Sequence, residues 1–326
     1  MATIKDIAKK SGLAVGTVSR ILNNRGYISE ASKQKVEKAM KELNYQPNIM
    51  AQNLSKTSSN LIGVIVPNIE HPYFSTIVAE IEKQFRLKGF QTIVMISYED
   101  ETNEEELIIQ CLKNRVFAII LCSGNVSSKT FETNNIPVIS IERHHTNGIA
   151  SIVCDNYLGG KLATEHLIDQ GCKNLLCLSG QGKINMPADD RVNGFKDVAK
   201  KNNVKFSVEI AEYSIFQNMD YNDLIKTLYE KHKDIDGVFC TSDVQAIQFV
   251  SYLSRAKVLV PKDIKVIGYD DTFVCNWGNP KISSIRQPLD KMVEATVNSL
   301  IDYKNGEIVK ETQVFPVSLI KRESTN

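Results

Sequence analysis

The sequence predicts two kinds of domain in one chain: a small all-α domain over residues 1–47 and a larger α/β body with parallel sheets over residues 61–326, joined by a segment at 48–60. In the first domain apolar side chains recur at helical spacing, whereas in the body short apolar runs alternate with amphipathic helices. The charge changes as well: residues 1–60 hold ten Lys and Arg residues against four Asp and Glu residues, a net +6, which leaves −5 for the remainder of a chain whose total is +1. A basic head on a mildly acidic body indicates that the head meets a polyanion.

Three short helices are expected in residues 3–45. Thr3 and Asp6 have the spacing of a capping box, Gly12 interrupts the first helix, and Ser29 is placed to cap the third. The apolar positions that define the three helices are Ile4, Ile7 and Ala8, then Val15, Val18, Ile21 and Leu22, then Val36, Ala39, Met40 and Leu43.

The body has the alternation that is typical of an α/β fold. Its strand-like runs are short and apolar, as expected for parallel sheets that helices cover on both faces. The body is long enough for two such units. The strand-like runs are 61–67, 91–97, 117–123, 136–142, 151–156, 174–180, about 208–213, 236–242 and 264–271. Helices are expected at 74–85, 104–113, 157–170, about 192–200, about 223–231 and after Asp243.

Several classes of protein are disfavoured by what the sequence lacks. The seven cysteines are scattered without a Cys-x-x-Cys pair, which indicates reduced, buried thiols in a cytoplasmic protein. The N-terminus has no signal-peptide core, and no apolar run is long enough to span a membrane. The five histidines show no metal-ligand spacing, and the dinucleotide, Walker and Gly-x-Ser-x-Gly motifs are missing. We therefore expect no enzyme activity, no metal and no cofactor.

A helix-turn-helix motif is indicated near the N-terminus. Such a motif needs a small residue in its first helix and a glycine in the turn, so that the second helix can enter the major groove. Ala8 and Gly12 fit these positions, and Thr17, Ser19 and Arg20 then lie on the second helix. Their side chains can donate hydrogen bonds to bases or phosphates. The alternative is a plain three-helix bundle with a solvated polar face.

Six segments along the chain have recognisable motifs: TIKDIAKKSGLAVGTVSRILN (3–23), ELNYQPN (42–48), AQNL (51–54), DNYLGGKLATEHLI (155–168), RVNGF (191–195) and VIGYDDT (266–272). Taken together, they resemble those of the lactose-repressor (LacI/GalR) family over nearly the whole chain. The resemblance implies a helix-turn-helix DNA-binding domain followed by the two-lobed, periplasmic-binding-protein-like α/β fold of that family. It also implies an N-lobe at about 61–156 and 287–310 and a C-lobe at about 157–286 and 311–326.

The resemblance implies a set of DNA contacts. Residues 49–54 match a hinge helix that orders on operator DNA, and Leu54 matches the leucine that wedges into the minor groove, where an apolar wedge unstacks a base step and bends the duplex. Two positions depart from the family: Ala14 stands where most relatives have a capping serine, and Gly16 brings no side chain to read a base. The implied DNA-binding residues are Thr3, Val15, Gly16, Thr17, Ser19, Arg20, Asn23, Tyr45, Asn48, Ala51 and Leu54.

The family fold implies an effector site between the lobes, near the carboxyl ends of the strands. Polyols are usually held by carboxylates and arginine, with an aromatic ring against the sugar face. Glu142 stands where many relatives have aspartate, and Ser242-Asp243 replaces a commoner Asn-Asp pair. The implied effector-binding residues are Tyr73, Phe74, Ser123, Glu142, Asp155, Arg191, Asp243 and Asp270. Alternatively, Phe74 is a core residue, and an aspartate after a strand is a helix cap.

Within the family the segments NNRGYIS, DNYLGGKLATEHLI and DQGCKN most resemble sucrose-operon and ribose-operon repressors. We therefore expect a repressor that binds a pseudo-palindromic operator as a homodimer and is released by a sugar or a sugar phosphate. The chain ends without leucine heptads, which favours a dimer over a coiled-coil tetramer. The alternatives are a catabolite-control regulator with a phosphorylated carrier protein as co-repressor, and a sugar-binding protein or enzyme without a role at DNA.

Overall fold

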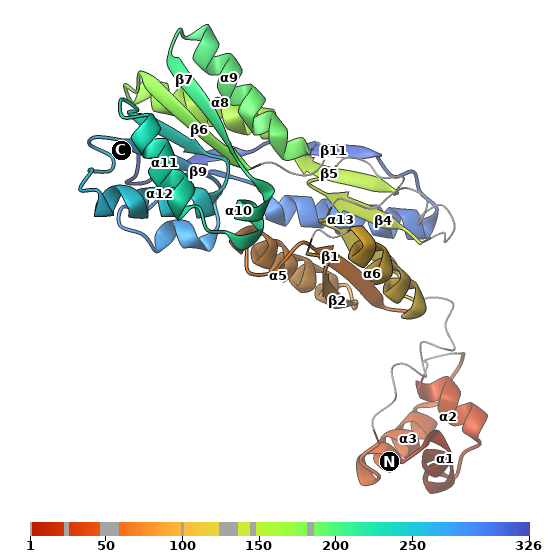
Figure 1. Ribbon diagram of the computed structural model, residues 1–326. Helices are drawn as coiled ribbons and strands as arrows, with labels where there is room; N and C mark the ends of the chain where they lie inside the picture. The colour runs from red at the N-terminus through yellow and green to blue at the C-terminus, as the bar shows by residue number, and fades with distance from the viewer. Residues whose placement is uncertain are drawn as a thin grey trace. The chain divides into compact units, whose positions relative to one another are not determined.

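The structure is a computed structural model that describes residues 2–22, 26–45, 59–98, 101–123, 136–143, 148–180 and 186–326. The chain forms two compact units, Met1–Ser59 and Asn60–Asn326, and Figure 1 labels their helices and strands. The first unit is helical and the second is α/β, so the predicted fold class is confirmed.

The first unit contains the three predicted helices around a small core. They are α1 (Ile4–Ser11), α2 (Val15–Leu22) and α3 (Glu30–Glu42). Each helix contributes its apolar stripe to the centre of the unit, as the helical spacing predicted. The buried side chains are Ile7 and Ala8 from α1, Val18 from α2, and Val36 and Ala39 from α3.

Local signals set the bounds of these helices. The backbone N–H and the hydroxyl of Thr3 both donate to Asp6 Oδ2, each at 2.8 Å, where α1 begins. Gly12 ends α1 with a φ of +69°, in the left-handed region that favours glycine. Ser29 Oγ accepts from the backbone N–H of Ser32, as expected of an N-cap. The predicted hinge helix at 49–54 lies outside the described residues.

The second unit contains two lobes, each built on a sheet of six described strands (Figure 1). In the N-lobe sheet the order is β11-β5-β4-β3-β1-β2 and every pairing is parallel. In the C-lobe sheet the order is β12-β10-β9-β8-β6-β7, and only β12 is antiparallel to its neighbour. The N-lobe strands are β1 (Leu61–Val66), β2 (Gln91–Ile96), β3 (Ala118–Leu121), β4 (Val138–Ile141), β5 (Ala150–Cys154) and β11 (Thr312–Phe315). The C-lobe strands are β6 (Asn174–Gly180), β7 (Lys205–Ala211), β8 (Gly237–Cys240), β9 (Lys265–Asp270), β10 (Ser283–Arg286) and β12 (Ser318–Ile320).

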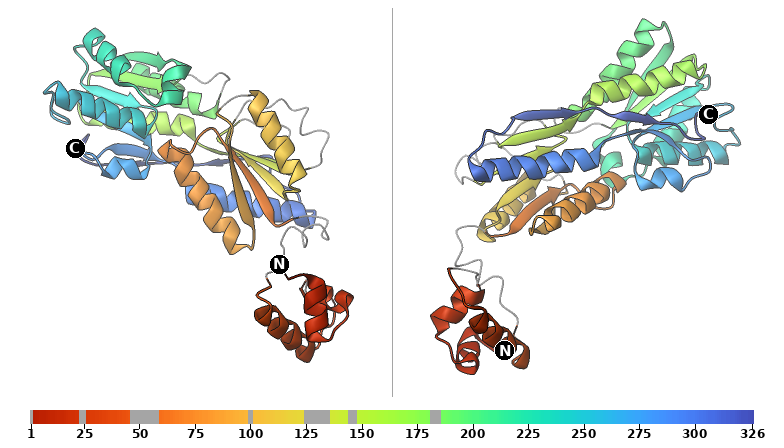
Figure 2. Two further views of the ribbon diagram at one scale, coloured as in Figure 1. Left: turned by 60° about the horizontal axis from the view of Figure 1, so that its bottom comes forward. Right: turned by 180° about the vertical axis from the view of Figure 1, so that it is seen from behind.

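Helices cover both faces of the N-lobe sheet, because alternate strand residues point to opposite faces and both sets are apolar. Ile62 and Val64 of β1 share a core with α5 and α13, whereas Ile65 shares one with α6. Helix α13 packs along α5 (Figure 2). The bounds are α5 (Pro72–Leu87), α6 (Glu101–Lys113) and α13 (Leu289–Asn305).

The C-lobe sheet is covered in the same way. Leu175 and Cys177 of β6 belong to the core with α8 and α9, whereas Leu176 and Leu178 belong to the core with α11 and α12. The bounds are α8 (Asn156–Asp169), α9 (Asp190–Lys201), α10 (Tyr213–Asn218), α11 (Asn222–Lys231) and α12 (Asp243–Arg255), with short 3-10 turns at Pro187–Asp189 and Phe273–Asn276. All seven cysteines are buried free thiols, as predicted.

The chain passes between the lobes three times, after β5, after β10 and after β11. The expectation that the last C-lobe segment starts at residue 311 is wrong. Strand β11 pairs with β5 in the N-lobe sheet, and only β12 joins the C-lobe, beside β10. Pro316, which has no backbone N–H to donate to a sheet, lies between β11 and β12.

No helix of the described segments is long and apolar enough to cross a membrane. Nor do the described segments hold a group of His, Cys, Asp and Glu side chains that could bind a metal ion.

Candidate nucleic-acid interface and effector site

Helix α2 presents the predicted reading residues on its outer side. Val15 is 42% exposed, and Gly16 and Arg20 are exposed as well. Thr17 and Ser19 are half-buried, while Val18 is fully buried against α1 and α3. Helix α2 therefore has one face buried in the core and the opposite face exposed to solvent, which is the arrangement that a helix needs to enter a DNA groove.

The two family departures lie at the start of α2. The carbonyl of Ala14 accepts from the backbone N–H groups of Thr17 (2.9 Å) and Val18 (3.0 Å), so Ala14 occupies the N-cap position without a side-chain acceptor. Gly16 has open space around it: a Cβ added there would meet no atom within 4 Å. Neither residue is required by packing, so both shape the surface that faces outward.

The other predicted DNA contacts divide into two groups. Thr3 is exposed, but its hydroxyl is engaged with Asp6. Tyr45 is half-buried and packs against the core of the first unit. The remaining predicted contacts lie outside the described residues: Asn23, Asn48, Ala51 and Leu54.

In the second unit, three predicted effector residues meet where the two lobes join. Glu142 follows β4 of the N-lobe, Asp270 ends β9 of the C-lobe, and Arg191 lies in the first turn of α9. Arg191 Nη2 is 3.8 Å from Glu142 Oε2, and Arg191 Nη1 is 3.7 Å from Asp270 Oδ1. All three side chains are less than 10% exposed, so the ion pairs form in a desolvated place. The sequence segments that carry them are far apart, and the carboxyl ends of parallel strands bring them together.

Arg191 is held by groups that the sequence did not single out. Its guanidinium carbon lies 3.6 Å from the centroid of the Tyr269 ring. Its Nε donates to Asn156 Oδ1 and its Nη1 donates to the carbonyl of Thr241, each at 2.7 Å. Burial lowers the pKa of Arg191, but the groups around it, Tyr269 and Asp270 foremost, outweigh burial and raise the pKa above its ordinary value. The guanidinium therefore stays charged and fixed in one orientation.

Asp270 is the acidic group whose ionisation the site disfavours most clearly. Burial raises the pKa of Asp270 to about 8, with the charge on Asp243 acting in the same direction and Arg191 opposing it. Gln287 Nε2 donates to Asp270 Oδ1 at 2.7 Å. The backbone of Asp270 has a φ of +103°, in the left-handed region that L side chains rarely adopt, and this turns the chain sharply at the end of β9.

Some buried hydrogen-bonding atoms of the second unit have no partner among the described residues. Among the described residues, the hydroxyls of Tyr73 and Ser123 and the Oε1 of Gln287 are buried without a hydrogen-bond partner. Burial raises the pKa of Tyr73 well above its ordinary value, and the nearby charge on Glu142 adds to the effect, so the phenol keeps its proton and can donate. Buried polar groups are normally paired, so these atoms indicate a place for a polar ligand or water.

Three predicted effector residues have intramolecular roles in the structure. Asp155 Oδ1 accepts from the backbone N–H of Leu158 at 2.8 Å and caps α8. Asp243 accepts at Oδ2 from Thr272 (2.7 and 2.9 Å) and at Oδ1 from Ser284 (2.6 Å). Phe74 is buried in the N-lobe core and packs edge-on against the rings of His71 (5.6 Å) and Tyr73 (5.2 Å). Their effector contacts stay predictions, because each side chain already has partners in its own fold.

The sequence analysis missed several members of the cluster. Asn156 stands in the recognised DNYLGG segment but received no role, although an amide directly after a strand is the signal that could have found it. Tyr269 stands in the recognised VIGYDDT segment but received no role, and Gln287 carries no periodic or motif signal. Phe216 lies on α10, a helix too short to be recognised by its spacing, and its ring lies 6.1 Å from the ring of His71 in the N-lobe. Burial lowers the pKa of His71 to about 4, so the imidazole next to this aromatic contact is neutral.

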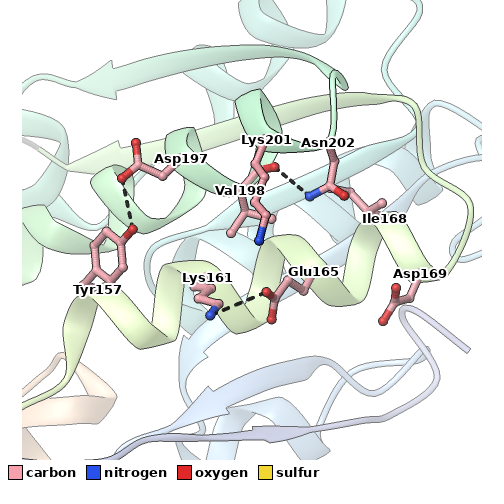
Figure 3. A pocket seen from close by; sticks show the side chains of 9 residues that line it. All are labelled: Tyr157, Lys161, Glu165, Ile168, Asp169, Asp197, Val198, Lys201 and Asn202. Carbon is pink, nitrogen blue, oxygen red and sulfur yellow. Dashed lines mark hydrogen bonds and ion pairs between the residues drawn. The ribbon is translucent and has the colours of Figure 1, made fainter.

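A separate surface pocket lies between α8 and α9 (Figure 3). It has a volume of about 440 Å³, and the Tyr157 hydroxyl donates to Asp197 Oδ2 across it at 3.0 Å. None of the predicted effector residues lines it. Its lining residues are Tyr157, Lys161, Glu165, Ile168, Asp169, Asp197, Val198, Lys201 and Asn202.

Comparison with known proteins shows which families and relatives the chain is similar to. The family described as "Bacterial regulatory proteins, lacI family" matches residues 3–48, and the "Periplasmic binding protein-like domain" matches residues 164–325. The ribose operon repressor of Halalkalibacterium halodurans is 32% identical, over 100% of this chain and 97% of its own. The ribose operon repressor of Bacillus subtilis is 33% identical, over 100% of this chain and 99% of its own. The sucrose operon repressor of Lactococcus lactis is 32% identical, over 98% of both chains.

Solved structures agree. A Lac repressor dimer bound to operator and the anti-inducer ONPF has a TM-score of 0.86 at 26% identity, over 99% of both chains. A LacI transcriptional regulator from Alkaliphilus metalliredigens in complex with D-xylulofuranose has a TM-score of 0.73 at 28% identity, over 82% of this chain and 100% of its own. The resemblance that the motifs indicated is therefore confirmed, and the chain belongs to the lacI family of bacterial regulatory proteins.

Proposed function

We propose that this protein is a sequence-specific, DNA-binding transcriptional repressor of a carbohydrate-utilisation operon, and that a sugar or sugar phosphate releases it from its operator. The relatives at 31–33% identity are repressors of ribose and sucrose operons, not enzymes. The protein acts in the bacterial cytoplasm and lies on the nucleoid while it is bound to DNA.

The DNA side of the proposal is supported by α2. Its open side carries Val15, Gly16 and Arg20, and the first sixty residues hold the positive charge that a phosphate backbone attracts. One such helix reads one half-site, so two copies related by a two-fold axis read a pseudo-palindrome. We therefore propose a homodimer. The wedge role of Leu54, which lies outside the described residues, predicts that Leu54→Asp abolishes operator binding.

The observation that carries the effector side is the hydrogen-bonding capacity left around Arg191. Its distances of 3.8 Å to Glu142 and 3.7 Å to Asp270 are too long for direct hydrogen bonds, although both carboxylates face the guanidinium. Tyr73 and Ser123 offer further buried hydroxyls without partners among the described residues. A polyol supplies closely spaced groups that both donate and accept, which is the chemistry that this set of atoms lacks.

The charges also favour one kind of sugar. The pKa of Asp270 is raised by burial, so this carboxyl is mostly protonated near neutral pH, and the charge of Arg191 is already balanced by Glu142 at 3.8 Å. A phosphate dianion would add two further negative charges in a desolvated place. Among the sugars and sugar phosphates that the family resemblance implies, we therefore expect the unphosphorylated sugar to bind more tightly.

The test begins with the operator. The full-length protein is used to select duplexes from a randomised DNA library, and fluorescence anisotropy then measures affinity for the selected duplex and for a scrambled one. We expect a pseudo-palindromic consensus and an affinity that falls by orders of magnitude between about 50 and 200 mM salt. Equal affinity for selected and scrambled duplexes would refute the repressor function.

The same assay identifies the effector. D-ribose, sucrose and their phosphate esters are titrated against the protein–operator complex, and a phosphorylated carrier protein is added in a separate arm. Release by a sugar supports the proposal. Tighter operator binding with the carrier protein, and no response to any sugar, would instead indicate a catabolite-control regulator. Turnover of a sugar without any effect at DNA would indicate an enzyme.

A further inference from the structure

Asn156 joins the two lobes in the middle of the effector site. It opens α8 directly after the chain leaves β5, and it is 3% exposed. Its Nδ2 donates to Glu142 Oε2 at 2.9 Å and to the Cys154 carbonyl at 3.3 Å. Its Oδ1 accepts from Arg191 Nε at 2.7 Å and from the Tyr269 hydroxyl at 3.3 Å. All the hydrogen-bonding positions of this amide are therefore filled.

The partners of Asn156 also fix which way its amide points. The Oδ1 faces two donors of the C-lobe, Arg191 and Tyr269, and the Nδ2 faces the carboxylate of Glu142 in the N-lobe. The other oxygen of Glu142 accepts from the backbone N–H of Cys154 at 2.5 Å. The amide is thus a bridge from an N-lobe anion to a C-lobe cation, and only a side chain with both a donor and an acceptor can form it.

The bridge occupies atoms that an effector also needs. Glu142 and Arg191 are the groups for which we propose sugar contacts, and in the structure the bond between Asn156 and each of them is shorter than their own separation of 3.8 Å. A sugar hydroxyl competes with the amide where it takes the position of Asn156 Nδ2 at Glu142 Oε2, or that of Asn156 Oδ1 at Arg191 Nε. The site with a bound sugar and the site with the Asn156 bridge are therefore alternative states. In the first the sugar contacts both lobes, and in the second Asn156 does.

We propose that Asn156 is the positioning residue that holds the lobes in the operator-binding arrangement, and that the effector acts by taking over its contacts with Glu142 and Arg191. The inference rests on the proposed repressor function. The chain is similar to a Lac repressor that is bound to operator, with a TM-score of 0.86, and we assign the bridged lobes to that state. Loss of the bridge shifts the population of lobe arrangements away from operator binding before any effector is added.

The chemistry of the pair allows a reciprocal test. Asn156→Asp places a carboxylate oxygen against Glu142, and Glu142→Gln places an amide N–H against the Asn156 Nδ2, so each single substitution creates a mismatch across the lobes. In the double variant the introduced amide at 142 donates to the introduced carboxylate at 156, which still accepts from Arg191. The net charge of the pair is then the same as in the wild type.

The measurement is the affinity of the full-length protein for its selected operator, at fixed salt and without effector. We expect each single variant to bind about tenfold more weakly, within the range that coupled neighbours show, and the double variant to recover to within about threefold of wild type. The matched control is Tyr157→Phe, at the residue that follows Asn156 on the exposed side of α8. It removes the hydrogen bond from Tyr157 to Asp197 and leaves the bridge intact. Its operator affinity should stay within about twofold of wild type.

Two results of these measurements would contradict the inference about Asn156. A folded Asn156→Asp protein with wild-type operator affinity would overturn the inference, and so would a double variant that binds no better than the singles. Thermal unfolding establishes that each variant is folded. If one single variant does not fold, the other carries the test; if neither folds, the operator affinity of the double variant decides it. A wild-type protein that selects no operator would refute the proposed function and the inference with it, whereas failure of the variant test alone leaves the proposed function in place.

Discussion

The guanidinium of Arg191 stacks on the ring of Tyr269, 3.6 Å from its centroid, which fixes this buried cation between two acidic side chains. The stack orients the planar fork of Arg191 so that its edge faces Glu142 and Asp270. A lysine could supply the charge but neither the flat face nor the Nε donor that Asn156 accepts. The site therefore depends on arginine for its geometry as well as for its charge.

Removal of this cation should strongly destabilise the fold. Arg191→Ala leaves the carboxylate of Glu142 buried without its counter-charge and removes the donors to Asn156 Oδ1 and to the Thr241 carbonyl. We expect a loss of about 3–5 kcal/mol in the free energy of unfolding, the range for breaking a buried ion pair from one side. Urea unfolding of the full-length protein, followed by circular dichroism, measures it.

The control for this loss is a second arginine of the C-lobe. Arg286 Nε contacts Asp271 at 2.6 Å, but its side chain is 54% exposed and Asp271 keeps a second partner in Arg322. Arg286→Ala should therefore cost no more than about 1 kcal/mol. Equal losses from the two substitutions would contradict the burial argument.

Asp270 should make the stability of the protein depend on pH. Burial raises the pKa of Asp270 to about 8 in the folded protein, above the ordinary aspartate value of 3.8, so folding favours the protonated form. The resulting contribution to stability is full below pH 4 and is lost as pH rises toward 8. Asp270→Asn mimics the protonated acid and keeps an acceptor for Gln287.

We therefore expect the wild type to lose stability relative to Asp270→Asn as pH rises from 5 to 8, by at most about 1.4 kcal/mol per pH unit. Burial raises the pKa of Asp243 as well, and because the two carboxyl groups interact, the difference reports the titration of the pair. Thermal unfolding of both proteins across this range checks the sign. A difference that stays constant, or that grows in favour of the wild type, would show that Asp270 ionises normally.

The fold of the first unit was predictable from the sequence because interactions between residues close in sequence determine most of it. The Thr3–Asp6 pair, the left-handed Gly12 and the Ser29 cap set helix ends within a few residues in sequence, and the apolar spacing identified the buried stripe. In the second unit, the strands were predictable because each is a short apolar run, a pattern that is also visible within a few residues. Strand β11 was assigned to the wrong lobe because its pairing with β5 links residues more than 150 apart, which no local pattern encodes.

The effector site was predictable only in part. Glu142 ends a strand-like run, Arg191 and Asp270 stand inside recognised motifs, and the structure brings both carboxyl groups within 4 Å of Arg191. Asn156 and Tyr269 were missed because their importance comes from partners in other segments. The sequence also could not tell that other acidic residues would be occupied within the fold, since a carboxylate after a strand serves a ligand or a helix cap equally well.

The alanine at the start of α2 offers a stabilising substitution. Ala14→Ser gives the N-cap a hydroxyl that can accept from the backbone N–H of Gly16 or Thr17, and such caps contribute about 1 kcal/mol. Hydrogen exchange of the α2 amides in the full-length protein should slow about fivefold. Ala31→Ser, at an exposed position inside the first turn of α3 that is not the cap, is the matched control and should leave exchange unchanged or slightly faster. Unchanged α2 protection in Ala14→Ser would mean that water already satisfies these groups.

The contact between α8 and α9 should be intolerant of a single methyl group. A Cβ added at Gly194 of α9 would overlap the carbonyl oxygen of Tyr157 and come within 2.9 Å of the backbone N of Lys161, both on α8. Backbone atoms cannot turn aside as side chains do, so Gly194→Ala must push the helices apart. We expect a loss of about 1–3 kcal/mol in the free energy of unfolding, as for an overpacked core.

The same displacement should reach the effector site, because α8 carries Asn156 in its first turn and α9 carries Arg191 in its own, joined by a 2.7 Å hydrogen bond. Gly194→Ala should therefore weaken binding of the releasing sugar, measured by calorimetry, although Gly194 lies outside the predicted contacts. Gly16→Ala is the matched control: a Cβ there meets no atom within 4 Å, and the gain in helix propensity should raise the stability of α2 by about 0.5–1 kcal/mol. If Gly194→Ala lowered stability and left sugar affinity unchanged, the helix pair would be a scaffold that does not set the geometry of Arg191.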